Sequence, residues 1–209
     1  MGRNPPINGL STQLELVNHV LPSFLSYLPA ALETLELPSC ALLNEDICFL
    51  SQSPQVSHLK KLDLSKNDLS QIVPGALEAL LREAAGTLQD LVLNHCGIRD
   101  LHLTVLLPAL SCCLHLHSFR FSGNCISTYS LENLLKLVTE LSELKVVVCP
   151  CPEEIYEYEE GMRMYSIQLE QFFSVKTMVQ NTLRASGRDT TDVYRTLFHV
   201  SNGPSSGLQ

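Results

Sequence analysis

Hydrophobic residues recur along this chain at fixed offsets, and polar residues fill the positions between them. The clearest instance, residues 59–69, reads L-x-x-L-x-L-x-x-N-x-L, the signature of one leucine-rich repeat. Leu62 and Leu64 alternate with polar residues, which predicts a short strand with one face in a core. Asn67 follows that strand, where its amide can bind backbone groups that a turn leaves unpaired. The pattern therefore indicates one strand-and-turn unit.

The same pattern occurs five times, which favours a repeat architecture. The first leucines of the five repeats are separated by 27, 29, 28 and 25 residues: Leu32, Leu59, Leu88, Leu116 and Leu141. A period of about 28 residues leaves room for a helix after each strand. Helical spacing is present in the intervening segments 77–81 and 131–138. In the fifth repeat, Cys149 takes the asparagine position and Cys151 replaces the closing leucine.

We therefore predict an α/β fold, a leucine-rich-repeat solenoid of the ribonuclease-inhibitor type, with parallel strands inside its arc and helices outside. Residues 12–149 are assigned to the solenoid, with a helix expected within residues 12–28. Residues 1–11 are predicted to be an irregular start that begins mid-repeat, because Asn8-Gly9-Leu10 matches only the end of the pattern. We expect from this that more chain belongs upstream of Met1.

After the fifth repeat the pattern stops, and residues 150–200 are predicted to form a C-terminal cap. The cap is expected to contain an acidic loop, a helix and a strand, in this order: 153–160, 162 to about 185, and 193–200. Ser186-Gly187 is expected to end the helix, because glycine suits a left-handed C-terminal residue. Residues 201–209 are rich in Gly, Ser and Pro and are expected to be disordered.

Composition restricts the functions open to such a fold. The chain has 14 Lys and Arg against 22 Asp and Glu, and its net charge of −8 disfavours nucleic-acid binding as the main activity. No apolar segment approaches the length that spans a bilayer, and no secretory signal is visible at the N-terminus. The eight cysteines are therefore expected to be reduced thiols in an intracellular protein, cytoplasmic and also nuclear as an alternative. Three of them are assigned to the asparagine position: Cys40, Cys96 and Cys149.

The residues between the strand leucines are the candidate binding residues. In a solenoid these positions line the concave surface, which repeat proteins generally use to hold other proteins. We predict that a protein partner contacts this surface through seven residues: Glu36, Lys61, Asp63, Asp90, Val92, Arg120 and Lys145. The column that runs from Glu36 to Lys145 changes from acidic to basic along the solenoid. The alternative is a solvated polar face without a particular ligand.

Other candidate chemistry finds little support in the sequence. The Cys-Pro-Cys segment 149–151 lacks the second pair of ligands that a structural zinc site needs, and the cysteines of segment 112–117 are adjacent and point apart. His95 beside Cys96 suggests a thiol–base pair, but the repeat position already explains Cys96, and a nucleophile needs an accessible thiolate. No glycine loop for phosphate binding is present. We predict no catalytic residue, no cofactor and no metal.

The segment after the fifth repeat carries a family resemblance. Residues 146–156 read V-V-V-C-P-C-P-E-E-I-Y, and the helical segments 75–81 (G-A-L-E-A-L-L) and 130–135 (S-L-E-N-L-L) precede them. Over residues 10–200 the chain resembles the PRAME family of leucine-rich-repeat proteins, in particular its oocyte-expressed oogenesins. The resemblance implies an intracellular germline protein without catalysis. Family members act as substrate receptors of cullin-RING ubiquitin ligases and as repressors of transcription, differentiation and apoptosis.

One departure from the family keeps a second interpretation open. Family members are considerably longer, and the region that recruits the elongin–cullin subunits lies in an N-terminal part without a counterpart here. A form that starts at Met1 is expected to keep partner binding and to lose ligase recruitment. The alternative function is therefore a ligase-independent protein-interaction module or inhibitor.

Overall fold

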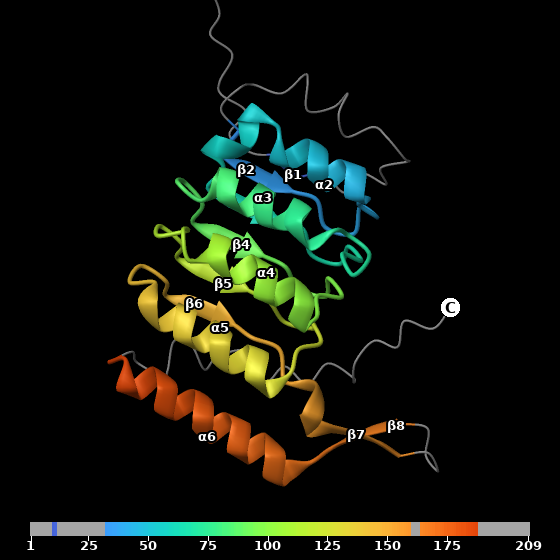
Figure 1. Cartoon of the computed structure of the whole chain (residues 1–209), viewed down its shortest axis with the longest axis vertical. Coiled ribbons are helices and arrows are strands. Elements are labelled where there is room, and N and C mark those ends of the chain that lie inside the picture. The colour runs from blue at the N-terminus through green and yellow to red at the C-terminus, as the bar shows by residue number, and fades with distance from the viewer. Residues whose placement is uncertain (1–9, 12–31, 160–163, 188–209) are drawn as a thin grey trace, which may run out of the picture.

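The computed structural model describes residues 10–11, 32–159 and 164–187. Within these ranges, parallel strands form one six-stranded sheet whose neighbours follow chain order: β1 Leu10–Ser11, β2 Thr34–Glu36, β3 Lys61–Asp63, β4 Asp90–Val92, β5 Ser118–Arg120 and β6 Val146–Val148. Helices follow the strands β2 to β5: α2 Asn44–Ser51, α3 Pro74–Ala84, α4 Asp100–Leu110 and α5 Thr128–Glu140. A short 3-10 helix, η1 (Pro54–His58), lies between α2 and β3. Figure 1 shows these units stacked along the long axis, with the helices in front of the strands. The predicted leucine-rich-repeat solenoid is confirmed.

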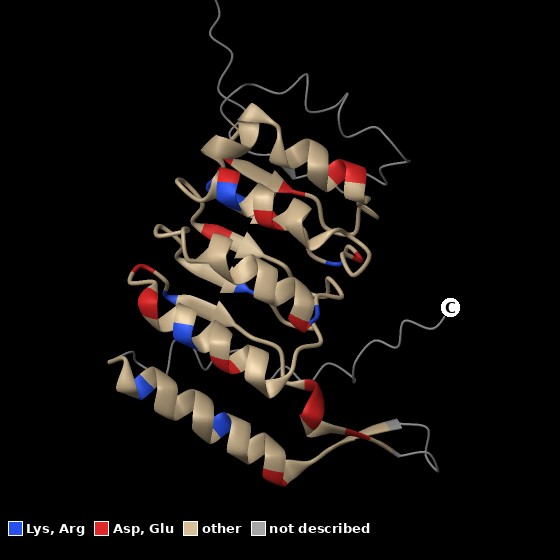
Figure 2. Ribbon diagram, in the orientation of Figure 1, with Lys and Arg blue, Asp and Glu red and all other residues tan. Residues whose placement is uncertain are grey.

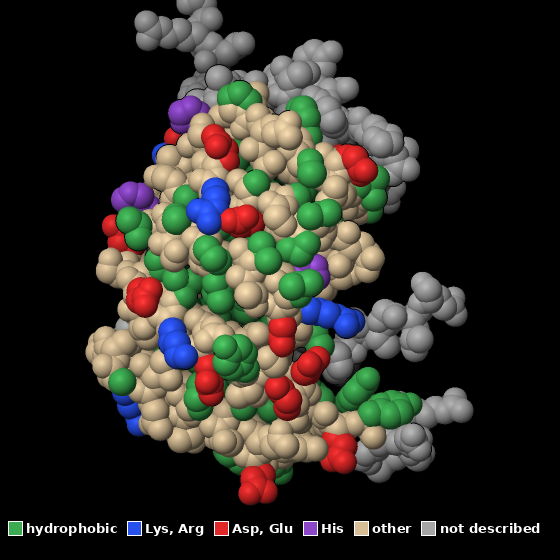
Figure 3. All heavy atoms as spheres, in the orientation of Figure 1, with side chains coloured by type: hydrophobic (Ala, Val, Ile, Leu, Met, Phe, Trp, Pro, Cys, Tyr) green, Lys and Arg blue, Asp and Glu red, His purple; other side chains and the backbone are tan. Residues whose placement is uncertain are grey.

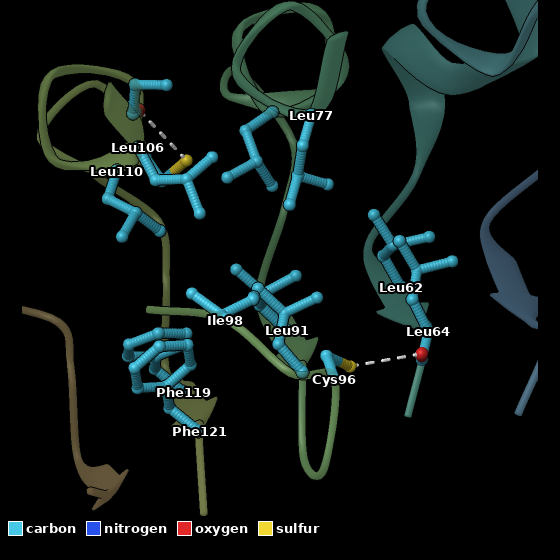
Figure 4. Close-up of a cluster of buried hydrophobic side chains, with 14 of the residues drawn as sticks. Leu62, Leu64, Leu77, Leu91, Cys96, Ile98, Leu106, Leu110, Phe119 and Phe121 are labelled. Atoms are coloured by element: carbon cyan, nitrogen blue, oxygen red, sulfur yellow. Dashed lines mark hydrogen bonds between the residues drawn. The ribbon is translucent and has the colours of Figure 1, made fainter. Parts of the chain in front are cut away.

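The hydrophobic core lies between the sheet and the helix layer (Figure 4). The central residues of β3, β4 and β5 stand opposite one another and are almost fully buried: Leu62, Leu91 and Phe119. Leu77 of α3 and Leu106 of α4 are buried on the other side of this layer. Each unit thus buries its strand leucines only by stacking on its neighbours, which is why the fold needs several repeats.

Buried asparagines connect successive repeats. The side chain of Asn67 accepts hydrogen bonds from the backbone N–H groups of Cys40 (2.9 Å) and Leu42 (3.3 Å) in the preceding repeat. Its amide nitrogen donates to the carbonyls of Leu37 and Leu64, both at 2.8 Å. One amide therefore satisfies four backbone groups that the turns leave without partners.

Asn124 repeats this arrangement two repeats later. Its side chain accepts from the N–H groups of Cys96 and Ile98, both at 3.1 Å, and donates to the carbonyls of Leu93 (2.7 Å) and Phe121 (2.9 Å). Cysteines occupy the asparagine position in the first and third repeats, as predicted for Cys40 and Cys96. The Cys96 thiol lies 3.3 Å from the carbonyl oxygen of Leu64 (Figure 4).

The fifth repeat differs from its predicted register by three residues. Strand β6 pairs with β5 so that Val147 stands opposite Phe119. Its repeat therefore starts at Leu144, 28 positions after Leu116, and not at Leu141. Cys149 is buried at the position of a strand leucine, so its assignment to the asparagine position was wrong. The three consecutive valines of β6 fit either register, and pairing with β5 decides between them.

The C-terminal part begins with a second short 3-10 helix, η2 (Glu153–Ile155). An antiparallel hairpin and the final described helix follow: β7 Tyr156–Glu159, β8 Met164–Ile167 and α6 Leu169–Ala185. The hairpin replaces the predicted acidic loop, and the predicted helix begins seven residues late because residues 164–167 pair with β7. The helix end is as predicted, with Gly187 at φ +71°. α6 packs beside α5 and buries its apolar face: Val175, Val179 and Leu183.

At the N-terminal side, Leu10 pairs with Leu35 at the centre of β2. Leu10 therefore occupies the position of a strand leucine, and its interpretation as the closing leucine of a repeat was wrong. The helix expected within residues 12–28, the strand 193–200 and the tail 201–209 lie outside the described residues. None of the described helices is both long and apolar enough to cross a bilayer.

Candidate protein-interaction surface

The strand residues that flank the buried central positions form two columns on the side of the sheet away from the helices. We call this surface the strand face. The first column contains Thr34, Lys61, Asp90, Ser118 and Val146. The second contains Glu36, Asp63, Val92, Arg120 and Val148. Six of the seven predicted binding residues thus share this surface, because alternation along each strand turns both flanking residues away from the core. Their role in binding stays a prediction.

Lys145 does not lie in the predicted column. Its backbone N–H donates to the carbonyl of His117 at 2.8 Å, one position before β6 begins. Val148 stands beside Arg120 in its place. This is a direct consequence of the shifted register of the fifth repeat, and it replaces the expected basic end of the column with an apolar residue.

Neighbouring groups bind two of the carboxylates at the acidic end of the strand face, those of Glu36 and Asp63. Lys61 of β3 forms an ion pair with Glu36 of β2. The carboxylate of Asp63 accepts a hydrogen bond from the backbone N–H of Ser65 at 2.8 Å. In the turn before these strands, Lys60 binds Glu33 across 2.8 Å. Exposed pairs of this kind contribute little stability, but they leave less charge free to attract a partner.

Arg120 differs from these charged residues in its surroundings. It is exposed, and among the residues that the structure describes it forms no ion pair. Val92 and Val148 stand on either side of it in the second column, and only 6% and 5% of their surfaces are exposed. Val92 therefore offers a partner little contact area of its own. An exposed guanidinium without an ion-pair partner among the described residues suits a carboxylate on a partner protein, because its planar donors can bind both carboxylate oxygens.

A cluster beside Lys145 was missed as a unit in the sequence. The ring nitrogens His115 Nδ1 and His117 Nε2 each lie 3.4 Å from Oε2 of Glu143. His115 and Glu143 are 28 residues apart, so the repeat period was the signal that could have joined them. All three side chains are about half exposed. No group of three or more potential metal ligands in the described ranges is arranged to hold a metal ion.

The cysteines show the features of structural thiols. All eight are free, and those at the centre of the solenoid are buried. Burial raises the pKa of the Cys96, Cys113 and Cys149 thiols to about 12 in each case. Because the thiolate is the nucleophile, Cys96 is poorly suited to the thiol–base chemistry that its neighbour His95 suggested.

Comparison with known proteins identifies relatives of the whole chain. Residues 12–205 match the family model described as the PRAME C-terminal domain. The human protein named leucine-rich repeat-containing protein 14 is 39% identical over 204 residues, which cover 93% of this chain and 41% of that protein. Human PRAME family member 12 is 43% identical over 137 residues, which cover 66% of this chain and 28% of that protein. The chain therefore spans less than half the length of these relatives, and neither name is that of an enzyme.

Proposed function

Because the chain belongs to the PRAME family, we propose that it is a non-enzymatic protein-interaction module whose strand face binds a partner protein. The observation that carries this proposal is Arg120, exposed and without an ion-pair partner among the described residues, between the buried Val92 and Val148. Solenoids generally bind along such extended strand surfaces. Charged residues in a desolvated centre dominate binding energy in many interfaces.

The finer proposal concerns what the bound protein is held for. In PRAME-type proteins that act as substrate receptors, the repeat domain presents a protein to a cullin-RING ubiquitin ligase. We extend this role to the present chain, in the cytoplasm and also the nucleus, with repression of transcription, differentiation and apoptosis in germ cells as the outcome. The oocyte-expressed oogenesins are the subgroup we propose for it. The alternative is a module or inhibitor that binds its partner without a ligase.

The test uses charge reversals on the two sides of the solenoid. A photo-crosslinking residue is placed at Asp90 in the otherwise unchanged protein, in the Arg120→Glu variant and in the Lys136→Glu variant. Lys136 is exposed on α5, on the helix side, so its variant has the same change in charge away from the strand face. We expect one crosslinked partner that Arg120→Glu loses and Lys136→Glu keeps. Equal crosslinking in both variants would contradict the proposed surface.

The two finer functions are separated by what accompanies the crosslinked partner. Recovery of elongin and cullin subunits with the partner, together with ubiquitin transfer to it that Arg120→Glu abolishes, supports the receptor role. Recovery of the partner without these subunits, and an unchanged ubiquitination level of the partner, favours the ligase-independent module. Both readouts are taken in cells, with this chain and with any longer form that contains it.

A further inference from the structure

The β7–β8 hairpin has a strand edge that is not used within the described part of the chain. It forms a two-stranded sheet separate from the solenoid sheet and projects from the end of the stack beside α6 (Figure 1). Tyr158 pairs with Tyr165, and Tyr156 with Ile167. Among the described residues, the backbone of neither strand forms a hydrogen bond with a third strand. Such an edge exposes a row of unpaired N–H and C=O groups that can pair with another chain.

One face of the hairpin is aromatic and anchored at its base. Tyr156, Tyr158 and Tyr165 lie on this face, because residues two apart on a strand share a side. Tyr156 is half-buried and hydrogen-bonds Cys151, and burial together with that thiol raises the pKa of its hydroxyl to about 12. The ring centroids of Tyr158 and Tyr165 lie 5.2 Å apart, and the two residues are 50% and 41% exposed. Tyr156 thus holds the hairpin to the solenoid, while the other two rings face outward.

The surroundings of the hairpin are acidic. Glu153, Glu154 and Glu157 are exposed, and Figure 2 shows acidic residues running from η2 into β7. On the face seen in Figure 3, large hydrophobic side chains of the hairpin stand at the surface with acidic side chains near them. The described residues of β7 and β8 include no lysine or arginine. Glu157 points to the side opposite the tyrosines and is held by Gln168, whose amide nitrogen donates to it at 3.0 Å.

From this geometry we propose that the edge of β7, which pairs with no third strand of the described residues, binds a basic, extended segment of a partner protein by β-strand addition. The incoming strand pairs its backbone with β7, which extends the hairpin to three strands. Its alternate side chains then face opposite sides: lysines or arginines lie beside Glu157, and apolar side chains lie against Tyr158, whose ring contacts Tyr165 of β8 on its other side. The basic charge follows from the acidic surroundings. This surface is separate from the strand face, so each can fail without the other.

The probe is a synthetic peptide of alternating lysine and valine with blocked ends, titrated into the full chain. We expect binding that weakens as salt is raised, and slower hydrogen exchange at β7 amides on binding. Glu157→Lys is expected to weaken binding about five- to tenfold, because it removes an attraction and adds a repulsion. Glu83→Lys, an equal change at an exposed site on α3, is expected to leave the affinity unchanged. Arg120→Glu is also expected to leave it unchanged, which separates this proposal from that of the strand face.

Backbone methylation distinguishes strand addition from simple charge attraction. Two further peptides carry N-methyl groups, one at every lysine and the other at every valine. In an added strand only alternate N–H groups face β7, so one methylated peptide is expected to lose binding and the other to keep it. If both peptides bind as well as the parent, or if the exchange of β7 amides does not change, strand addition is wrong. Loss of binding by both methylated peptides would also overturn the proposal.

Discussion

Replacement of Asn67 by alanine tests the most specific polar interaction of the solenoid. The side chain of Asn67 is 1% exposed and bonds four backbone groups. Alanine leaves the N–H groups of Cys40 and Leu42 without partners, and each buried unpaired N–H costs about 1–3 kcal/mol. The carbonyl of Leu37 loses its partner as well, while that of Leu64 keeps the contact with a thiol. We therefore expect the free energy of unfolding to fall by about 3–5 kcal/mol.

Cys40→Ala is the matched control for this substitution. Cys40 occupies the asparagine position of the first repeat, and its thiol makes only a weak contact of 3.5 Å with the carbonyl of Pro38. Its backbone N–H keeps the bond to Asn67, so the loss is limited to a small buried group, about 1 kcal/mol. Urea denaturation followed by circular dichroism measures both variants.

Hydrogen exchange locates the effect of Asn67→Ala. The amides of Cys40 and Leu42 are expected to exchange faster in this variant, whereas those of Cys96 and Ile98, which bind Asn124, keep their protection. A loss of stability within about 1 kcal/mol of that of Cys40→Ala would refute the reasoning. Unchanged exchange at Cys40 and Leu42 would refute it as well.

Three further predictions follow from single sites. Gly123→Ala should lower the free energy of unfolding by at least about 1–3 kcal/mol in urea denaturation, because Gly123 has φ +69° and an added Cβ would lie 2.1 Å from a ring atom of His95. Adding His95→Ala to this variant removes the clash but not the backbone strain, so it should recover only part of the loss. Burial raises the pKa of Asp100, but hydrogen bonds from neighbouring serines outweigh it and hold this pKa below its usual value. The carboxylate therefore stabilises the fold above the usual carboxyl pKa of about 4 and loses that contribution as the pH falls, so Asp100→Asn should show a flatter decline in acid denaturation. Iodoacetamide at neutral pH should label the exposed Cys112 and spare the buried Cys96, as peptide mass spectrometry can show; equal labelling would contradict the packing.

Much of the fold could be predicted because each repeat is determined by a short stretch of sequence and its immediate neighbours. Every central leucine of β2 to β4 was assigned correctly, since each repeat contacts only its neighbours and the same constraints recur about every 28 residues. The register predicted for the fifth repeat was wrong because Val146, Val147 and Val148 are all apolar, so this strand lacks the apolar–polar alternation that indicates a register. The spacing of 25 residues, shorter than the other three, was the remaining sign of the error.

The β7–β8 hairpin was not predicted, for a different reason. The segment Tyr156–Glu159 alternates aromatic and acidic residues, which is a strand pattern, but its acidity favoured a loop. Tyr165 also fits the helical spacing that leads into α6, so the helix was extended too far. Only the pairing between β7 and β8 decides between a strand and a loop or helix here. That pairing depends on both strands and cannot be predicted from the sequence of one.

The candidate site could likewise be predicted only in part. Columns on the strand face follow from alternation, so six of seven residues were placed on it, and Lys145 was displaced by the register error. The ion pair of Lys61 with Glu36 and the burial of Val92 depend on neighbouring strands and could not be read from one repeat. Because Glu36 is already paired with Lys61, Arg120 is more available to a partner's charge than Glu36 is.

The alternation of asparagine and cysteine has a mechanical consequence. Asn67 ties the second repeat to the first, and Asn124 ties the fourth to the third, each through directional bonds that fix one spacing. Between the second and third repeats the same position holds Cys96, whose thiol contacts the carbonyl of Leu64 at 3.3 Å. Backbone hydrogen bonds still join these two repeats, from the N–H groups of Leu64 and Lys66 to the carbonyls of Val92 (3.0 Å) and Asn94 (2.8 Å). The spacing between β3 and β4 is therefore set by backbone pairing and apolar packing, whereas Asn67 and Asn124 add a buried amide to the spacings on either side.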